Sequence, residues 1–537
     1  MEIKHKRTKT TMAFILICSL AAACATVVSG IRYGPGTTHD SAAYMYAAQS
    51  LRNGEGLQYF GYPSPFIQWP PLYPLLLALG ELAGLTSRLS STIVNSLAFA
   101  LTVFIAGRWM LRTFKNIVFT IGGTLLLLLS VPLLQVSEYL WTEILFVLFF
   151  LLLYTNLEHF IRYGNYGSLA FAGFFSALAC IDRYAGVTIV AAACFFLLFS
   201  KKGILNGFMN AAFYGVISAI PMGAWVVRNY IVSGTLLGVR LPSTFTLSQN
   251  IKRSLESIYT WVQPDKLLSR HISVHLLSAA KLFTILVPVL IITAFTVFMI
   301  RALLLGQPAG KLSKRRKNDE VYEENVRKDI DRLFPITFFM VFSLIYIVYL
   351  VASATSVAFE PINSRYLIPV YVPLVLVVLA AADLLFSVIK INTKAAGLVL
   401  PLLMILFLVY PAANMAASVY DSWKNGAGGY AAASWRGKSG FLEHMQKNGQ
   451  HTYYSNNADV VYIISGIRTY SPPKKSGPYM YGLGQFKAAV DRDENSILIW
   501  FDNAVPQTLY SLEELSAIYK MKETGKFEGG KIYQITK

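Results

Sequence analysis

Two acidic residues stand next to long apolar segments, where a carboxylate is costly unless it has a partner or a ligand. Asp40 follows a Gly/Pro/Thr turn and precedes a helix-favouring run, so we expect it at or beside a helix N-terminus. Glu143 stands at the head of an apolar segment, after a short polar stretch that contains Glu138. A capping role alone explains Asp40 equally well, but two such carboxylates together favour a chemical role.

Arginines and aromatic residues accompany these acids on the other polar segments. Asp182 is followed directly by Arg183, and these two residues are open to the simpler interpretation of a neutralised pair. A single arginine beside an apolar segment often only extends its charged end into water. Several arginines and carboxylates at one end of a set of helices instead favour an anion-binding cavity. The candidate substrate-binding residues are His39, Tyr44, Glu138, Arg183, Arg228, Arg240, Arg365 and Tyr366.

Such a cavity suits a sugar that is carried on a polyprenyl phosphate. The lipid tail lies between helices, the phosphate binds guanidinium groups, and the sugar packs on aromatic rings. Transfer of the sugar needs a base that deprotonates the acceptor and a cation that stabilises the departing phosphate. An Asp or Glu supplies the base, whereas Arg, Lys or a divalent metal supplies the cation.

The composition sets the environment in which these residues act. Of 537 residues, 55% are hydrophobic and only 14% are charged, and the apolar residues form long blocks. Soluble domains carry about 25% charged residues, and about 20 helical residues span a bilayer core. The sequence therefore predicts an all-α polytopic membrane protein and excludes disordered, collagen-like and disulfide-rich classes.

About eleven apolar segments are long enough to be spanning helices. They lie near residues 12–30, 90–107, 116–135, 142–158, 168–182, 184–200, 205–227, 279–302, 334–356, 366–387 and 395–414. Residues 70–85 are also apolar, but a crossing there would invert every later loop. We expect this segment to be a juxtamembrane or re-entrant helix that starts at Pro70 and Pro71 within a first outer loop of residues 31–89.

The positions of Lys and Arg orient the chain in the plasma membrane. With a cytoplasmic N-terminus, the predicted inner loops carry more basic residues than the outer loops, as the positive-inside rule requires. The densest basic run, Lys314 to Lys317, lies in a predicted cytoplasmic loop at 303–333. The net charge of +18 is thus explained by contact with an anionic leaflet, and no nucleic-acid partner is predicted.

The composition changes after the last apolar segment. Residues 1–417 form the predicted membrane domain, and residues 418–537 are typical of a small soluble α/β domain. The odd number of spans places this second domain outside the cell. Its predicted strand-forming runs are HTYYSN, VVYIIS, SILIWFD and KIYQIT, and SLEELSAIYK is typical of a helix.

Several short motifs, in this order, resemble bacterial membrane glycosyltransferases of the GT-C superfamily, in the branch of protein O-mannosyltransferases and aminoarabinose transferases. The first is Asp40-Ser41 with Tyr44, Ala47, Gly54, Gly56 and Leu57. The others are Trp69 to Pro74, Trp141 to Glu143, Asp182 to Gly186, Trp225 to Asn229, Gly234 to Arg240, and Arg365 to Pro369. The stretch from Tyr454 to Gly466 also resembles the outer domain of such chains.

The resemblance implies a GT-C fold and an inverting transfer from a polyprenyl-phosphate-linked sugar to an acceptor on the outer face. Asp40 matches the general base of that family, and Glu143 matches its second acidic residue, with Glu138 as the alternative. Arg228 and Arg365 match the arginines that contact the lipid phosphate. The acceptor is a lipid, a polysaccharide or a protein. The paired acidic motif of metal-dependent relatives is missing from the first loop, so we predict no resident metal, although a divalent ion remains an option.

Three other classes fit parts of the pattern. A transporter or lipid flippase also places charges in a membrane cavity, but the chain has no internal repeat and its carboxylates stand at helix ends. A cell-wall polymer ligase uses a similar donor and a similar face of the membrane. A scaffold that only presents the C-terminal domain has no need for a base at Asp40.

Overall fold

A computed structural model of the chain describes most of its length. The described residues are 2–199, 203–261, 319–358, 360–388, 393–435, 437–447, 451–476, 481–493, 495–502 and 508–536, with parts of 275–296. Half of the span predicted at 279–302 and the basic run of the predicted loop at 303–333 lie outside these residues.

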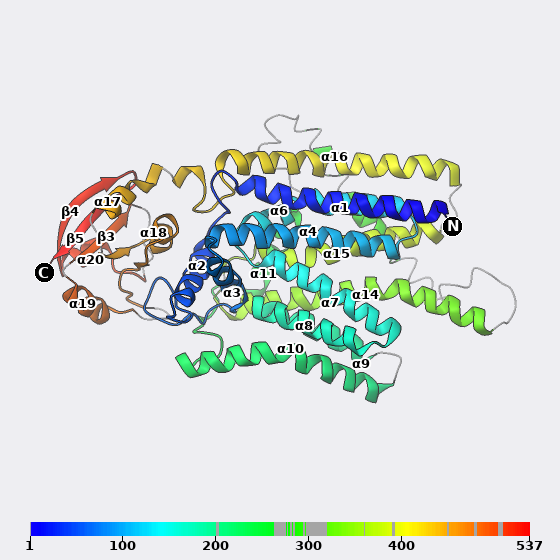
Figure 1. Cartoon of the computed structure of the whole chain (residues 1–537), viewed down its shortest axis with the longest axis horizontal. Helices are drawn as coiled ribbons and strands as arrows, with labels where there is room; N and C mark the ends of the chain where they lie inside the picture. Colours follow the sequence, from blue (N-terminus) through cyan, green and yellow to red (C-terminus); the bar gives the residue numbers. More distant parts are fainter. Residues whose placement is uncertain are drawn as a thin grey trace.

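Helices that run along the long axis form a bundle that makes up most of the molecule (Figure 1). They are α1 (Glu2–Gly30), α4 (Ser87–Thr113), α5 (Ile117–Leu128), α6 (Val131–Glu138), α7 (Glu143–Tyr163), α8 (Tyr166–Asp182), α9 (Val187–Leu198), α10 (Ile204–Ser233), α14 (Asp319–Ser356), α15 (Ser364–Val388) and α16 (Thr393–Asn425). Within the described residues, seven helices are long and apolar enough to cross a membrane. The prediction of an all-α polytopic membrane protein is confirmed.

Three of the predicted spans differ from single long helices in the structure. The span predicted at 116–135 is a pair of helices, α5 and α6, bent by 41°. The bend coincides with Ser130, whose side chain caps α6 by accepting a hydrogen bond from Leu133 N, and with Pro132 in the first turn. The predicted spans at 168–182 and 184–200 correspond to the shorter apolar helices α8 and α9, which the 3₁₀ turn η1 (Tyr184–Gly186) joins.

Shorter helices cover one end of the bundle. They are α2 (His39–Arg52), α3 (Leu72–Leu82) and α11 (Leu247–Thr260), and the C-terminal sheet lies beyond α2 and α3 (Figure 1). We call this end the domain end, and the end where the N-terminus lies the distal end. With 11 residues, α3 is shorter than the ~20 residues that a crossing needs.

Aromatic packing in the bundle core holds α7 against α14. Phe150 stacks on Phe342 with 4.2 Å between ring centroids, and Tyr154 lies 4.5 Å from Phe339. All four side chains are fully buried. This packing fixes the direction of α7. The helix begins at the domain end, and its first residue is Glu143.

The C-terminal sheet has five strands in the order β2-β1-β3-β5-β4. The strands are β1 (Thr452–Ser455), β2 (Thr469–Tyr470), β3 (Ser496–Phe501), β4 (Lys520–Phe527) and β5 (Gly530–Thr536). The pairs of β1 with β2 and β3 are parallel, whereas β5 pairs antiparallel with β3 and β4. All six residues of β3 are buried, as its apolar run SILIWF requires in a central strand.

In the described part of this domain, four helices pack around the sheet, and one of them corrects a sequence expectation. They are α17 (Phe441–Lys447), α18 (Ala458–Ser465), α19 (Leu483–Arg492) and α20 (Leu512–Ser516). The run VVYIIS was predicted as a strand but lies in α18. Parallel strands β1 and β2 need a crossover connection, and Gly466, with φ of +73°, ends the helix that supplies it.

The predicted domain boundary at residue 417 falls inside α16, which continues to Asn425. The chain then turns through Gly426, Gly428 and Gly429, which all have positive φ, and enters the sheet region. The division at 417 therefore stays a prediction.

Candidate active site

The segment that leads into α2 is clamped between two other parts of the chain. Gly36 N donates to Glu138 O, and Leu140 N donates back to Gly36 O. On the other side, Tyr430 N donates to Thr37 O at 2.9 Å. A side chain on Gly36 would collide with the Tyr139 ring, so the close approach requires glycine here.

The first turn of α2 places Asp40 at the domain end of the bundle. Thr38 precedes the helix, and its N–H donates to Ser41 Oγ at 2.9 Å. Ser41 Oγ also donates to Leu140 O at 3.0 Å, and Trp141 Nε1 donates to Thr38 Oγ1 at 3.0 Å. These bonds tie the start of α2 to the connection between α6 and α7, so Asp40 lies beside the start of α7.

Arg365 joins the two acids that the sequence singled out. Its Nη2 lies 2.7 Å from Asp40 Oδ2, and its Nε donates to Glu143 Oε1 at 2.6 Å. The guanidinium also stacks on the Trp141 ring, 4.1 Å from the ring centroid. The side chain of Arg365 is only 10% exposed, so both ion pairs are largely shielded from water.

Glu143 accepts from a second arginine. Arg183 Nη1 pairs with the same Oε1 of Glu143 and donates to Thr142 Oγ1 at 2.8 Å. Arg183 therefore does not pair with Asp182, whose two carboxylate oxygens accept no hydrogen bond from the described residues although the side chain is buried. Two carboxylates and two guanidinium groups thus form one compact group, which we call the charged cluster. It consists of Asp40, Glu143, Arg183 and Arg365.

Within the charged cluster, Asp40 is the acid that a substrate can reach. Its side chain is 20% exposed, whereas that of Glu143 is fully buried. A cavity of about 210 Å³ opens beside Asp40. Its lining consists of Thr38, His39, Asp40, Gln135, Trp141, Glu360, Asn363, Ser364 and Arg365. Glu143 thus holds the two arginines, whereas the Asp40 carboxylate lies in the wall of the cavity.

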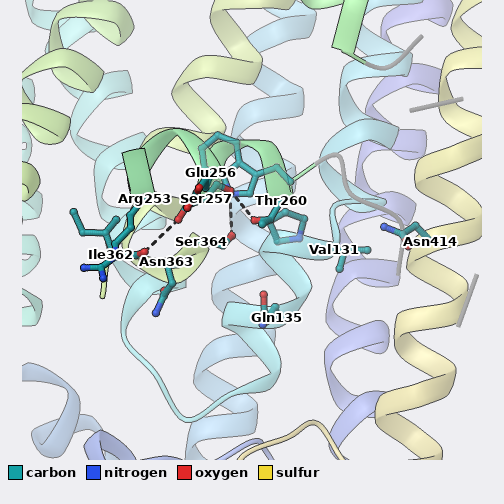
Figure 2. A pocket seen from close by; sticks show the side chains of 12 residues that line it. Val131, Gln135, Arg253, Glu256, Ser257, Thr260, Ile362, Asn363, Ser364 and Asn414 are labelled. Carbon is teal, nitrogen blue, oxygen red and sulfur yellow. Dashed lines mark hydrogen bonds between the residues drawn. The ribbon is translucent and has the colours of Figure 1, made fainter. Parts of the chain in front are cut away.

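A second cavity, of about 420 Å³, shares Gln135, Asn363 and Ser364 with the first. Figure 2 shows that side chains of α6, α11, α16 and the start of α15 surround it. Trp261 Nε1 donates to Ser364 Oγ at 2.9 Å and Ser257 Oγ to Ile362 O at 3.4 Å, which joins α11 to the start of α15. The polar lining contrasts with the apolar helices around it.

Arg253 of α11 is the basic residue of this second cavity. Its guanidinium lies 3.8 Å from the centroid of the Phe245 ring. Its Nη1 is buried and has no hydrogen-bond partner among the described residues. A buried guanidinium N–H without an acceptor is costly, and an anion in the cavity would supply one.

A third cavity, of about 800 Å³, continues from the second and shares Val131, Pro132, Trp261 and Asn414 with it. Its walls come from α5, α11, α15, α16 and residues 285–292. They are almost entirely apolar, with side chains such as Leu374, Val378, Leu403 and Phe407. The first two cavities therefore have charged and polar linings, whereas the third, which shares no lining residue with the first, is almost entirely apolar.

The remaining predicted arginines hold the first loop. Arg228 Nη1 donates to Phe66 O at 2.6 Å, and its guanidinium stacks on Trp225 with 4.8 Å to the ring centroid. Arg240 Nη2 donates to Gln68 O at 2.9 Å. Both side chains thus bind backbone carbonyls of the segment between α2 and α3, and a role in phosphate binding stays a prediction.

The other predicted residues lie around the charged cluster or behind it. Tyr366 OH donates to Glu360 Oε2 at 3.0 Å, at the first cavity. Tyr44 is buried and packs edge-on against Tyr73, with 5.4 Å between ring centroids. Glu138 is buried at the end of α6 and faces Ser29 and Ser422 instead of the cluster.

His39 contacts the C-terminal region. Its Nδ1 lies 3.3 Å from Asp459 Oδ2, and its Nε2 lies 2.9 Å from the hydroxyl of Tyr59. Asp459 was not among the sequence candidates. The stretch from Tyr454 to Gly466 that resembles an outer domain contains it, but no motif marked it as a neighbour of Asp40. Arg253 was not a candidate either, because only its position at the second cavity distinguishes it from the neighbouring basic residue of α11, Lys252.

In the part of the chain that the structure describes, no set of three or more His, Cys, Asp or Glu side chains lies close enough together to hold a metal ion.

The fold and this site define a class of polytopic membrane protein with a helical bundle, a charged first-loop helix and a C-terminal sheet at one end. Among solved structures, the chain is similar to apo ArnT from Cupriavidus metallidurans, with a TM-score of 0.57 and 11% identity. The similarity covers 96% of this chain and 97% of that chain. The chain therefore has an ArnT-like GT-C fold.

Two further structures support the same fold. ArnT from Cupriavidus metallidurans bound to undecaprenyl phosphate has a TM-score of 0.54 and 12% identity, again over 96% of this chain and 97% of that chain. Arabinofuranosyltransferase AftD from Mycobacteria has a TM-score of 0.52 and 13% identity, over 98% of this chain and 40% of AftD. No family model and no curated protein sequence matches the chain.

Proposed function

We propose that the protein is a membrane glycosyltransferase that moves a sugar from a polyprenyl-phosphate donor to an acceptor, with inversion at the anomeric carbon. The observation that carries this proposal is the order of the three cavities. They lead from Asp40 and Arg365, past Arg253, to an apolar space between helices. The similarity to ArnT with bound undecaprenyl phosphate supports the same class of donor.

Each part of the donor matches one cavity. The polyprenyl chain occupies the apolar third cavity, where its burial is favourable. The phosphate lies in the second cavity, where it accepts a hydrogen bond from the free Nη1 of Arg253. The sugar then reaches the first cavity, beside Asp40 and the Trp141 ring.

Asp40 is the general base of the transfer. It removes the proton from the acceptor hydroxyl or amine, whose lone pair forms the new glycosidic bond as the bond from the anomeric carbon to the phosphate oxygen breaks. The electron pair of that bond leaves with polyprenyl phosphate, and Arg253 stabilises the developing charge. Because the nucleophile attacks opposite the leaving group, the configuration inverts.

Arg365 and Glu143 position the base. The guanidinium of Arg365 pairs with Asp40 and so fixes the position of its carboxylate beside the first cavity. Glu143 binds Arg365 and Arg183 in turn, which holds the Arg365 fork in one orientation. The charged cluster therefore keeps the Asp40 carboxylate in place before the acceptor arrives.

The proposed topology places this site on the outer face of the plasma membrane. The positive-inside rule sets the N-terminus in the cytoplasm, and α1 runs from there to the domain end, where Asp40 lies (Figure 1). The C-terminal domain of residues 418–537 is then extracytoplasmic. A lipid-linked donor reaches the second and third cavities from within the membrane.

A transfer assay with a donor panel tests this function. The purified full-length protein in nanodiscs receives radiolabelled polyprenyl-phosphate sugars and a membrane extract as acceptor, and the label in non-donor products is counted. We expect transfer from one class of donor. Movement of an intact labelled lipid between leaflets, without label in any product, would instead establish a flippase and overturn the proposal.

A further inference from the structure

The C-terminal domain docks directly on the helix that carries Asp40. Tyr462 of α18 donates from its hydroxyl to Gln49 Oε1 of α2 at 2.9 Å. Its ring packs edge-on against Tyr46 of α2, with 5.5 Å between centroids, and is buried. A second contact comes from Arg88, which donates to Ile463 O. The domain thus packs along one side of α2.

Asp459, in the first turn of α18, is the acid at the centre of this contact. Its Oδ2 accepts from the hydroxyl of Tyr430 at 2.6 Å and lies 3.3 Å from His39 Nδ1. Its Oδ1 accepts from Val460 N at 2.9 Å. The carboxylate is 14% exposed, so its charge is poorly screened by water.

The partners of Asp459 both lead to the start of α2. His39 is the residue directly before Asp40. Tyr430 contacts Asp459 through its hydroxyl and Thr37 O through its N–H. The peptide that carries Asp40 is therefore held on the domain side by Asp459, while Arg365 holds the Asp40 carboxylate from the bundle side.

The geometry points to Asp459 as a positioning residue for the transfer reaction: through His39 and Tyr430 it fixes the first turn of α2, so that Asp40 keeps its place against Arg365 only while the C-terminal domain is docked. This inference rests on the proposed function. It gives the domain a part in catalysis beyond covering the cavity.

The charges around His39 make this contact dependent on pH. The groups that face the ring are Asp459 from α18, Tyr59 from the first loop, and the carboxylates of Asp40 and Glu360. Desolvation lowers the pKa of His39, but the hydrogen bond to Asp459 and the nearby negative charges outweigh it and raise the pKa overall. Burial raises the pKa of Asp459, but His39 and Tyr430 lower it overall.

The sign of the pH effect follows from these directions. A raised pKa of His39 means that the contact is favourable at pH values below the ordinary pKa of histidine and is lost as the pH rises through the raised value. Asp459 stays ionised over the same range. At alkaline pH the neutral ring therefore holds the first turn of α2 less firmly.

The variant Asp459→Asn removes the charge with almost no change in shape. The matched control is Asp502→Asn, an exposed acid of the same domain. For Asp459→Asn we expect kcat to fall about tenfold or more, as small misplacements of catalytic groups do, with an unchanged KM for the donor. The pH dependence of kcat that comes from this contact should also be absent in Asp459→Asn, because the variant has no charge with which protonated His39 can pair.

Two further measurements separate positioning from simple docking. The variant His39→Gln combined with Asp459→Asn should lower kcat no more than Asp459→Asn alone, because the His39 change acts through a contact that Asp459→Asn already removes. Hydrogen exchange of peptides covering residues 36–44 should be faster in Asp459→Asn than in the wild type and in Asp502→Asn. This last readout does not depend on catalysis.

The outcomes distinguish this inference from the proposed function. Wild-type kcat in Asp459→Asn, or unchanged exchange of residues 36–44, would overturn the positioning role. Full additivity of His39→Gln and Asp459→Asn would do the same. Faster exchange in Asp459→Asn, together with a wild-type protein that transfers no sugar, would leave the contact in place and refute the proposed function instead.

Discussion

The two ends of the bundle carry similar groups of charges. At the domain end, Glu143 is fully buried and binds Arg183 and Arg365. At the distal end, Glu158 of the same helix is 2% exposed and binds Arg112 Nη2 at 2.6 Å and Arg162 Nη2 at 2.9 Å. Each group is thus a buried glutamate between two arginines.

The arginines of the two groups differ in exposure and in what lies beyond them. Arg112 and Arg162 are 51% and 28% exposed, and their pairs with Glu158 join α4 to α7 and one turn of α7 to the next. Arg183 and Arg365 are 15% and 10% exposed, and Arg365 continues to Asp40 and a cavity. A glutamate between two arginines is therefore a contact that both ends share, and what distinguishes the domain end is the additional acid, Asp40, at a cavity.

The sharpest contrast comes from one acid at each end. Asp383, at the distal end, holds the turn between α4 and α5 by accepting from Lys115 N at 3.0 Å and Asn116 N at 2.9 Å. We expect Asp40→Asn to lower kcat by roughly 10²- to 10⁴-fold, because the amide cannot accept the acceptor proton. Asp383→Asn should keep wild-type transfer and cost about 1 kcal/mol of stability, as the loss of a charge-assisted hydrogen bond does.

The assay for this pair is transfer by equal amounts of protein, with folding checked by size-exclusion chromatography and thermal unfolding. Equal transfer by Asp40→Asn and Asp383→Asn would remove the proposed chemical difference between the two ends.

The two buried glutamates give the second contrast. Glu143→Gln leaves Arg183 and Arg365 without their shared charge, so Asp40 loses its fixed partner and kcat should fall roughly 10- to 100-fold. Glu158→Gln should keep wild-type kcat and cost about 1 kcal/mol of stability, because its exposed arginines are solvated by water. Steady-state kinetics and thermal unfolding of both variants measure these effects. A loss of kcat in Glu158→Gln that matches Glu143→Gln would contradict the account.

The third contrast compares two arginines. Arg253→Ala removes the free buried donor of the second cavity, and a charge-assisted bond to phosphate is worth about 1.5–3 kcal/mol. The KM for the donor should therefore rise about tenfold or more, with a smaller change in kcat. Arg112→Ala, at the distal end, should leave that KM unchanged. Titration of the donor with both variants is the measurement. An unaltered KM in Arg253→Ala would show that the donor phosphate does not bind Arg253.

Much of the fold follows from the sequence for a clear physical reason. Long apolar blocks have no stable place outside a bilayer, so the bundle was predictable. The bend between α5 and α6 depends on the cap at Ser130, which hydropathy does not register. The run VVYIIS has strand-forming residues, yet the parallel pairing of β1 and β2 requires a helix there.

The candidate site was predictable only in part. Asp40, Glu143, Arg183 and Arg365 were each visible as charges next to apolar segments, and the structure brings all four together. Arg228 and Arg240 show the same sequence signal but bind loop carbonyls. Arg253 was missed because it stands out only by an unpaired N–H in a cavity, which the sequence does not show. Asp459 was missed because it contacts His39, which is far away along the chain.

Direct mapping of the donor lipid decides between the two ends of the bundle. A polyprenyl phosphate with a photoreactive group next to its phosphate is crosslinked to the wild-type protein in nanodiscs, and the labelled peptides are identified with and without excess unlabelled lipid. The account predicts competed labelling of α11, around Arg253, and of residues 362–364. Competed labelling around Arg112 and Glu158, or labelling that excess lipid does not reduce, would contradict the placement of the active site at the domain end.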